Sequence, residues 1–108
     1  MKQFAIAIAT LSASLSAALV FAGSAQASEA LATKSGCTAC HKIEGKLVGP
    51  AYKEVAAKYK GNAKAEAMLI DKVKKGSMGV WGPIPMPPNA AVKDEDIKTL
   101  VKWVLSLK

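Results

Sequence analysis

Apolar residues recur with the period of an α-helix along the second half of the chain. Tyr52, Val55, Ala56 and Tyr59 occupy positions i, i+3, i+4 and i+7 of one helix face. No stretch alternates between apolar and polar residues with the period of two that marks a half-buried strand. The sequence therefore predicts an all-α protein with irregular connections. Its predicted helices cover residues 28–35, 51–60, 65–75 and a last segment that begins near residue 94.

A stretch rich in glycine and proline separates the last two predicted helices. Proline fixes φ and donates no backbone N–H, so residues 76–91 are predicted to form a loop. The helix after it is expected to begin near Asp94, because acidic side chains stabilise a helix amino terminus. The residues that interrupt helical structure in the loop are Gly76, Gly79, Gly82, Pro83, Pro85, Pro87 and Pro88.

The first 27 residues have the pattern of a secretory signal peptide. Lys2 provides a positive amino terminus, residues 4–22 are mostly apolar, and Ala25-Gln26-Ala27 is a small-residue cleavage site. A retained membrane anchor is the alternative, because the apolar stretch is nearly long enough to span a bilayer. We expect the leader to direct export and to be cleaved after Ala27. The exported protein then consists of one domain, residues 28–108.

Composition and charge narrow the classes of function. The 108 residues include 15 lysines, no arginine, 8 acidic residues and two cysteines. Loss of the leader removes one lysine and lowers the formal net charge from +7 to +6. The guanidinium group of arginine makes paired hydrogen bonds to guanine and to phosphate, and this basic chain has no arginine. Its composition therefore argues against nucleic-acid binding. A domain this small usually needs a cofactor, a metal or disulfides for stability, and two cysteines are too few for a disulfide framework.

The chemistry of the chain is concentrated in Cys37-Thr38-Ala39-Cys40-His41. This C-x-x-C-H arrangement is the attachment signature of c-type haem. The two cysteines of such a motif add across the two vinyl groups of one haem, and the adjacent histidine serves as an axial ligand of the iron. The sequence therefore predicts one covalent haem c per chain, attached at Cys37 and Cys40 and ligated by His41.

Three other interpretations of the cysteines are weaker. A thioredoxin-like dithiol needs a βαβ setting, and no strand is predicted. A structural zinc site needs four ligands, whereas Cys37, Cys40 and His41 are three, and the chain has no further cysteine or histidine. A disulfide between Cys37 and Cys40 would close a very short loop and would constrain little of the chain.

Met86 is the predicted second axial ligand. It lies between Pro85 and Pro87, where the restricted backbone can hold a thioether against iron without helical support. Met78, in a flexible turn, is the alternative, and Met68 on a predicted helix is more typical of a packing residue. Histidine and methionine ligation is common in cytochromes c and favours a high potential. Two protein ligands leave no open coordination position, which favours electron transfer over catalysis.

Four segments together resemble bacterial cytochrome c-551, also called cytochrome c8. The resemblance covers nearly the whole of residues 28–108, and the proline–methionine segment is specific to that family. It implies a class I cytochrome c fold, with short helices wrapped around one haem. The segments are residues 37–41, Val48-Gly49-Pro50-Ala51-Tyr52, residues 79–89 and Lys102-Trp103-Val104-Leu105.

The resemblance also implies roles for residues around the haem. The carbonyl of Pro50 is expected to accept a hydrogen bond from the ring of the proximal histidine. Trp81 is expected to donate its indole N–H to a haem propionate, and Asn89 to steady the methionine sulfur. Lys72 stands where some relatives have an arginine near a propionate, and Met78 where relatives have a polar residue.

The predicted function is that of a soluble, monomeric electron carrier of the periplasm, not an enzyme. By resemblance, it takes electrons from a quinol-oxidising complex and delivers them to a terminal reductase or oxidase, such as nitrite reductase. Its positive charge favours redox partners with acidic docking faces, and no stable membrane insertion is expected. A haem enzyme or gas sensor in which Met86 leaves the iron is the alternative, and a thiol redox protein is a third possibility.

Overall fold

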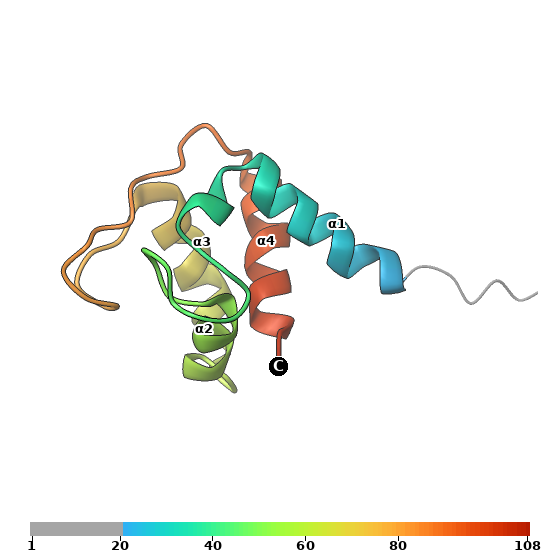
Figure 1. Cartoon of the computed structure of the whole chain (residues 1–108), viewed down its shortest axis with the longest axis horizontal. Coiled ribbons are helices and arrows are strands. Elements are labelled where there is room, and N and C mark those ends of the chain that lie inside the picture. Colours follow the sequence, from blue (N-terminus) through green and yellow to red (C-terminus); the bar gives the residue numbers. More distant parts are fainter. Residues whose placement is uncertain (1–20) are drawn as a thin grey trace, which may run out of the picture.

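Helices make up all the regular structure in the part of the chain that the structure describes, which is residues 21–108, with side chains from Ser28 onward. The coordinates are a computed structural model. The elements follow in the order α1 (Phe21–Lys34), a short 3₁₀ helix η1 (Cys37–Ala39), α2 (Tyr52–Lys58), α3 (Ala65–Lys75) and α4 (Asp94–Ser106) (Figure 1). No helix within these residues is long and apolar enough to cross a membrane. Most of the proposed leader lies outside the described residues.

The predicted helices are all present, with differences at their ends. α3 has the predicted bounds, and α4 begins at the predicted Asp94, with three acidic residues in its first turn. α2 is shorter than predicted because the chain turns at Tyr59 and enters the left-handed region at Gly61, where φ is 77°. α1 (Phe21–Lys34) includes residues before Ser28, where the predicted helix began. The alanine-rich stretch before Ser28 holds no proline, so helical structure can continue across the proposed cleavage site.

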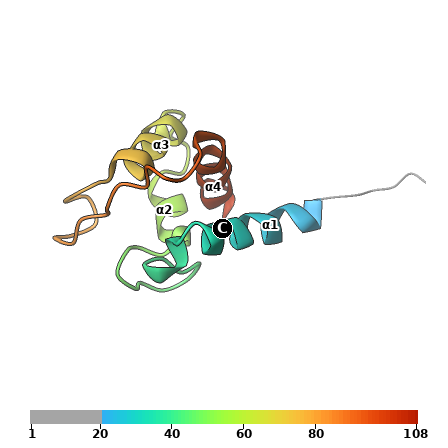
Figure 2. The ribbon, with the colours of Figure 1, turned by 90° about the horizontal axis from the view of Figure 1, so that it is seen from above.

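α4 is the central element of the fold. It packs against α1, α2 and α3, and lies between α1 and α3 in both Figure 1 and Figure 2. Its apolar face is buried, and Ile97 is the largest side chain with no measurable exposure among the described residues. The other buried residues of α4 are Leu100, Val101 and Trp103.

Residues 76–91 form the predicted loop, which extends away from α4 (Figure 1). One antiparallel pair of backbone hydrogen bonds closes it, with the Ser77 and Met86 N–H groups each donating to the other residue's carbonyl, at 3.1 and 2.8 Å. Gly76, at φ 87°, makes this closure possible, because a Cβ there would lie 2.7 Å from the Met86 carbonyl oxygen. The loop therefore has a defined base although it contains no strand.

Replacing Ile97 with alanine tests the central role of α4. Because the Ile97 side chain is fully buried, we expect Ile97→Ala to lower the free energy of unfolding by about 2–5 kcal/mol. Lys98→Ala, on the exposed face of the same helix, is the control and should change stability by less than about 0.5 kcal/mol. Chemical denaturation of both variants measures the difference, and equal losses would contradict the packing described here.

Candidate haem site

A cavity of about 190 Å³ lies between the four α-helices and the loop. Every α-helix contributes to its wall, including Ala32 of α1, Val55 of α2, Leu69 of α3 and Val101 of α4. The wall also includes six of the seven predicted site residues, and the seventh, Asn89, lies outside it. The six are Cys37, Cys40, His41, Pro50, Trp81 and Met86.

The two cysteines lie at the short helix η1, an element that the periodicity of the sequence did not predict. Gly36, at φ 82°, turns the chain out of α1, and the N–H groups of Cys40 and His41 both donate to the Cys37 carbonyl. This tight turn brings the whole motif to the cavity wall. Cys37 and Cys40 form no disulfide with each other, and both side chains are partly buried. Burial raises the pKa of the Cys37 thiol, a backbone hydrogen bond opposes the change, and the neighbouring Cys40 adds to it.

The His41 ring is oriented by a hydrogen bond of 2.8 Å between its Nδ1 and the Pro50 carbonyl oxygen. A carbonyl only accepts, so Nδ1 carries the proton and Nε2 keeps a free lone pair. This is the tautomer that a metal needs when it binds at Nε2. The contact predicted for Pro50 from the resemblance is thus present, and it prepares His41 for ligation.

Gly49 makes room for this ring, a role that the sequence analysis did not assign. A Cβ on Gly49 would lie 2.5 Å from His41 Cε1 and 2.9 Å from Nδ1. The Tyr52 ring is stacked with the imidazole at a centroid distance of 5.3 Å. The position of Gly49 directly before Pro50 was the available signal, since a glycine often marks a close approach of side chain and backbone.

Tyr52 carries the clearest sign that the cavity holds a bound group. Its side chain is buried at the cavity, yet its hydroxyl has no hydrogen-bond partner. A buried hydroxyl without a partner costs about 1–3 kcal/mol. Burial, together with the nearby Cys37 thiol, raises the pKa of the phenol. An apolar cavity with two cysteine side chains, an oriented imidazole and an unpaired phenol in its wall fits a large, mostly apolar, covalently attached group such as haem.

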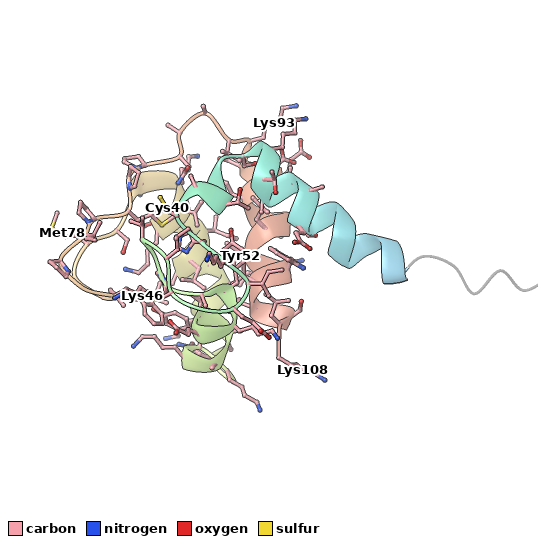
Figure 3. All side chains as sticks on the ribbon, viewed as in Figure 1. Cys40, Lys46, Tyr52, Met78, Lys93 and Lys108 are labelled. Carbon is pink, nitrogen blue, oxygen red and sulfur yellow. The ribbon has the colours of Figure 1, made fainter. Side chains whose placement is uncertain are left out.

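Met86 and Met78 differ in how they meet the cavity. Both residues contribute to its lining, but Met86 is partly buried and Met78 is 75% exposed. Figure 3 shows the Met78 side chain at the outer end of the loop, far from Cys40. Met68 does not border the cavity. Of the three methionines in the described residues, Met86 therefore fits the predicted ligand best.

The remaining predicted contacts concern Trp81, Asn89 and Lys72. Trp81 borders the cavity, and the Lys58 ammonium lies 5.4 Å from the centre of its ring, within the range of a cation–π contact. The Asn89 amide nitrogen donates to the carbonyls of Val73 and Pro87, at 3.1 and 3.2 Å. Asn89 thus ties the loop to α3, and its contact with the Met86 sulfur stays a prediction. Lys72 borders the cavity, as a residue near a propionate would.

A family model for cytochrome c matches residues 25–108. The chain belongs to the cytochrome c family. Cytochrome c-551 of Pseudomonas aeruginosa is 62% identical to it over 80 residues, which are 74% of this chain and 76% of the relative. Cytochrome c-552 of Nitrosomonas europaea is 55% identical over 91 residues, which are 84% of this chain and 88% of the relative. The crystal structure of wild-type Nitrosomonas europaea cytochrome c552 matches with a TM-score of 0.72 at 54% identity, over 74% of this chain and 99% of that chain.

These similarities confirm the predicted family, the all-α cytochrome c fold and the cofactor. Cytochromes c bind haem c covalently, and this chain has the two cysteines of the attachment motif. The protein is therefore a small cytochrome c that carries electrons.

Replacing Gly49 with alanine tests the packing around His41. The added methyl group would overlap the imidazole ring, so we expect Gly49→Ala to displace the ring from the Pro50 carbonyl and to lower the fraction of exported chain that carries haem. Absorbance of haem relative to total protein measures that fraction.

Gly61→Ala is the control for this experiment. A Cβ at Gly61 meets open space, although its φ of 77° makes alanine unfavourable. Gly61→Ala should therefore lower stability while leaving haem content near the wild-type level. If Gly49→Ala kept its full haem content, the close contact would not matter for cofactor binding.

Proposed function

We propose that this cytochrome c is a periplasmic one-electron carrier in which Cys37 and Cys40 hold the haem as thioethers and His41 and Met86 ligate its iron. Haem c supplies the one-electron chemistry. The observation that carries the ligand assignment is the His41 Nδ1 to Pro50 carbonyl bond, which leaves Nε2 free at a cavity that Met86 also borders. The apolar walls limit water at the site and so limit the reorganisation that accompanies a change of charge.

The positions of the other groups support this assignment. The stacked Tyr52 ring and the room left by Gly49 hold the imidazole in one orientation. The backbone pair between Ser77 and Met86 fixes the chain at the methionine. Trp81 and Lys72 border the cavity and provide an indole N–H and an ammonium group for the propionates. Each group acts by holding or orienting, and none is required to bind a substrate.

Export is part of the proposal. The leader pattern of residues 1–27, with its Ala25-Gln26-Ala27 site, supports cleavage and a periplasmic location. Residues 28–108 then form the carrier domain, which we propose to act as a monomer. In bacteria, haem is attached covalently to proteins outside the cytoplasm, so the predicted haem c also supports export.

The surface at the mouth of the cavity supports transient docking of redox proteins. Lys46 and Lys72 border the cavity, and the chain carries a formal charge of +7 before any leader is removed. A positive carrier is attracted to an acidic face over a distance, and a small apolar contact then allows rapid release. We propose a quinol-oxidising complex as donor and a terminal reductase or oxidase, such as nitrite reductase, as acceptor. The exposed apolar residues of the mouth, which we call the rim, are Val48, Met78, Val80 and Ile84.

Replacing Met86 tests the ligand set. Oxidised haem with thioether ligation has a weak near-infrared band, which we expect in the wild type and not in Met86→Ala. Met86→His should keep the haem attached and lower the reduction potential, because a second imidazole favours the oxidised state relative to a thioether. Absorption spectra and potentiometric titration measure the two effects.

Met68→Leu, away from the cavity, is the matched control and should keep both the band and the potential. An unchanged near-infrared band in Met86→Ala would overturn the assignment of Met86 as ligand. Met78 would then be the next candidate. Rapid binding of carbon monoxide to the reduced wild type would instead favour the haem enzyme or gas sensor. If the measured mass of the exported protein equalled that of the polypeptide alone, with no haem added, a thiol redox protein would be favoured.

The charge at the mouth can be tested with small redox probes of opposite charge. We expect the reduced protein to react faster with ferricyanide as the salt concentration falls, and slower with tris(phenanthroline)cobalt(III). Lys46→Gln should weaken both salt dependences more than Lys108→Gln, because Lys46 borders the cavity and Lys108 ends the chain, as Figure 3 shows. Stopped-flow rates measure the slopes. Equal slopes for the two probes would contradict a positive field at this surface.

A further inference from the structure

Met78 occupies an unusual place for a methionine. Its side chain is 75% exposed, more than any other exposed large apolar residue of the described chain, of which Ile84 at 62% comes next. Gly79, at φ 86°, follows it, and no Cβ placed there would meet a neighbouring atom. The thioether therefore stands in open surroundings at the outer end of the loop, as Figure 3 shows.

The three methionines of the described residues differ in their access to solvent. Met68 on α3 and Met86 at the base of the loop are both partly buried. In the proposed ligand set, the Met86 sulfur would also bind iron. Oxidation of a thioether follows the access of the oxidant to the sulfur. Met78 is thus the sulfur that a soluble oxidant meets first.

We propose that Met78 is a modification site, at which hydrogen peroxide oxidises the thioether reversibly to a sulfoxide. The peroxide O–O bond breaks, one oxygen atom bonds to the sulfur, and water leaves. The sulfur loses two electrons and the peroxide gains them. A methionine sulfoxide reductase reverses the change.

The position of Met78 determines what the modification changes. Met78 lies outside the backbone pair that closes the loop, since Ser77 and Met86 make those hydrogen bonds. A sulfoxide at Met78 therefore leaves the hydrogen bonds at the base of the loop in place. It converts an apolar member of the rim, beside Val80 and Ile84, into a strongly polar group. The modification itself depends only on exposure, whereas its effect on docking rests on the proposed function.

Limited oxidation of the haem-loaded protein with hydrogen peroxide tests the site. We expect peptide mass spectrometry to find one added oxygen at Met78 several-fold sooner than at Met68 or Met86, with the near-infrared band unchanged at that stage. Met78→Leu should lose the early oxidation, while Met68→Leu should keep it. Earlier oxidation at Met68 or Met86, or equal rates at all three, would overturn the proposal.

The effect on the rim is tested by electron self-exchange between reduced and oxidised copies of the protein, measured by NMR line broadening at high salt. We expect slower exchange after oxidation and in Met78→Gln, which places a polar group of similar size at the rim. Met78→Leu should exchange like the wild type, and sulfoxide reductase should restore the rate of the oxidised protein. Wild-type exchange in both the oxidised protein and Met78→Gln would overturn the effect on docking. Failure of the carrier function would show differently, as a missing thioether band in the untreated protein.

Discussion

The helices of this protein surround a cavity that their own side chains leave unfilled. Four of the ten buried apolar residues are alanines, and Ile97 is the largest side chain of the described residues that is fully buried. Such a core buries little apolar surface for a domain of this size, and small domains of this kind usually depend on a staple. Residues of all four α-helices line the cavity, so a haem held there would join these helices through one group. For this reason we expect the stability of the fold to depend on the binding of the cofactor.

Two glycines set the geometry around the proposed iron ligands. Gly49 lies against the His41 ring, and Gly76 against the Met86 carbonyl, and at each a Cβ would come closer than 3 Å to the neighbour. Both sites have a backbone contact of their own, His41 with Pro50 and Met86 with Ser77. The same device thus recurs at two positions far apart in the chain. At Gly49 it allows the His41 side chain to be held by the main chain, and at Gly76 it allows the Met86 backbone to pair with that of Ser77.

The sequence predicted what depends on local periodicity and on the chemistry of motifs. The bounds of α3 and the start of α4 follow from amphipathic spacing, glycine and acidic residues, and these were correct. The start of α1 was not, because alanine-rich sequence supports helix on both sides of the proposed cleavage site. η1 is a single turn without periodicity, and local pattern could not predict it.

Most contacts between distant segments could not be predicted from the sequence. The resemblance indicated Pro50, but the closeness of Gly49 to the His41 ring and the unpaired hydroxyl of Tyr52 depend on how α2 packs. Asn89 shows the same limit. Its amide donates to Val73 on α3, a partner 16 residues away that no local pattern indicates.

The loop of residues 76–91 separates two tasks that one short segment must perform. At its base, the pair between Ser77 and Met86 and the bond from Asn89 to α3 hold the chain against the cavity. Its outer part carries the exposed Val80 and Ile84 and has no such bonds to the helices among the described residues. A change of side chain there alters the surface that a partner meets, while the base keeps the ligand in place. Electron transfer needs both, because the iron site must stay constant while the docking contact must form and break many times. Pro85, between Ile84 and Met86, supports this separation because it restricts the chain without requiring a further hydrogen bond.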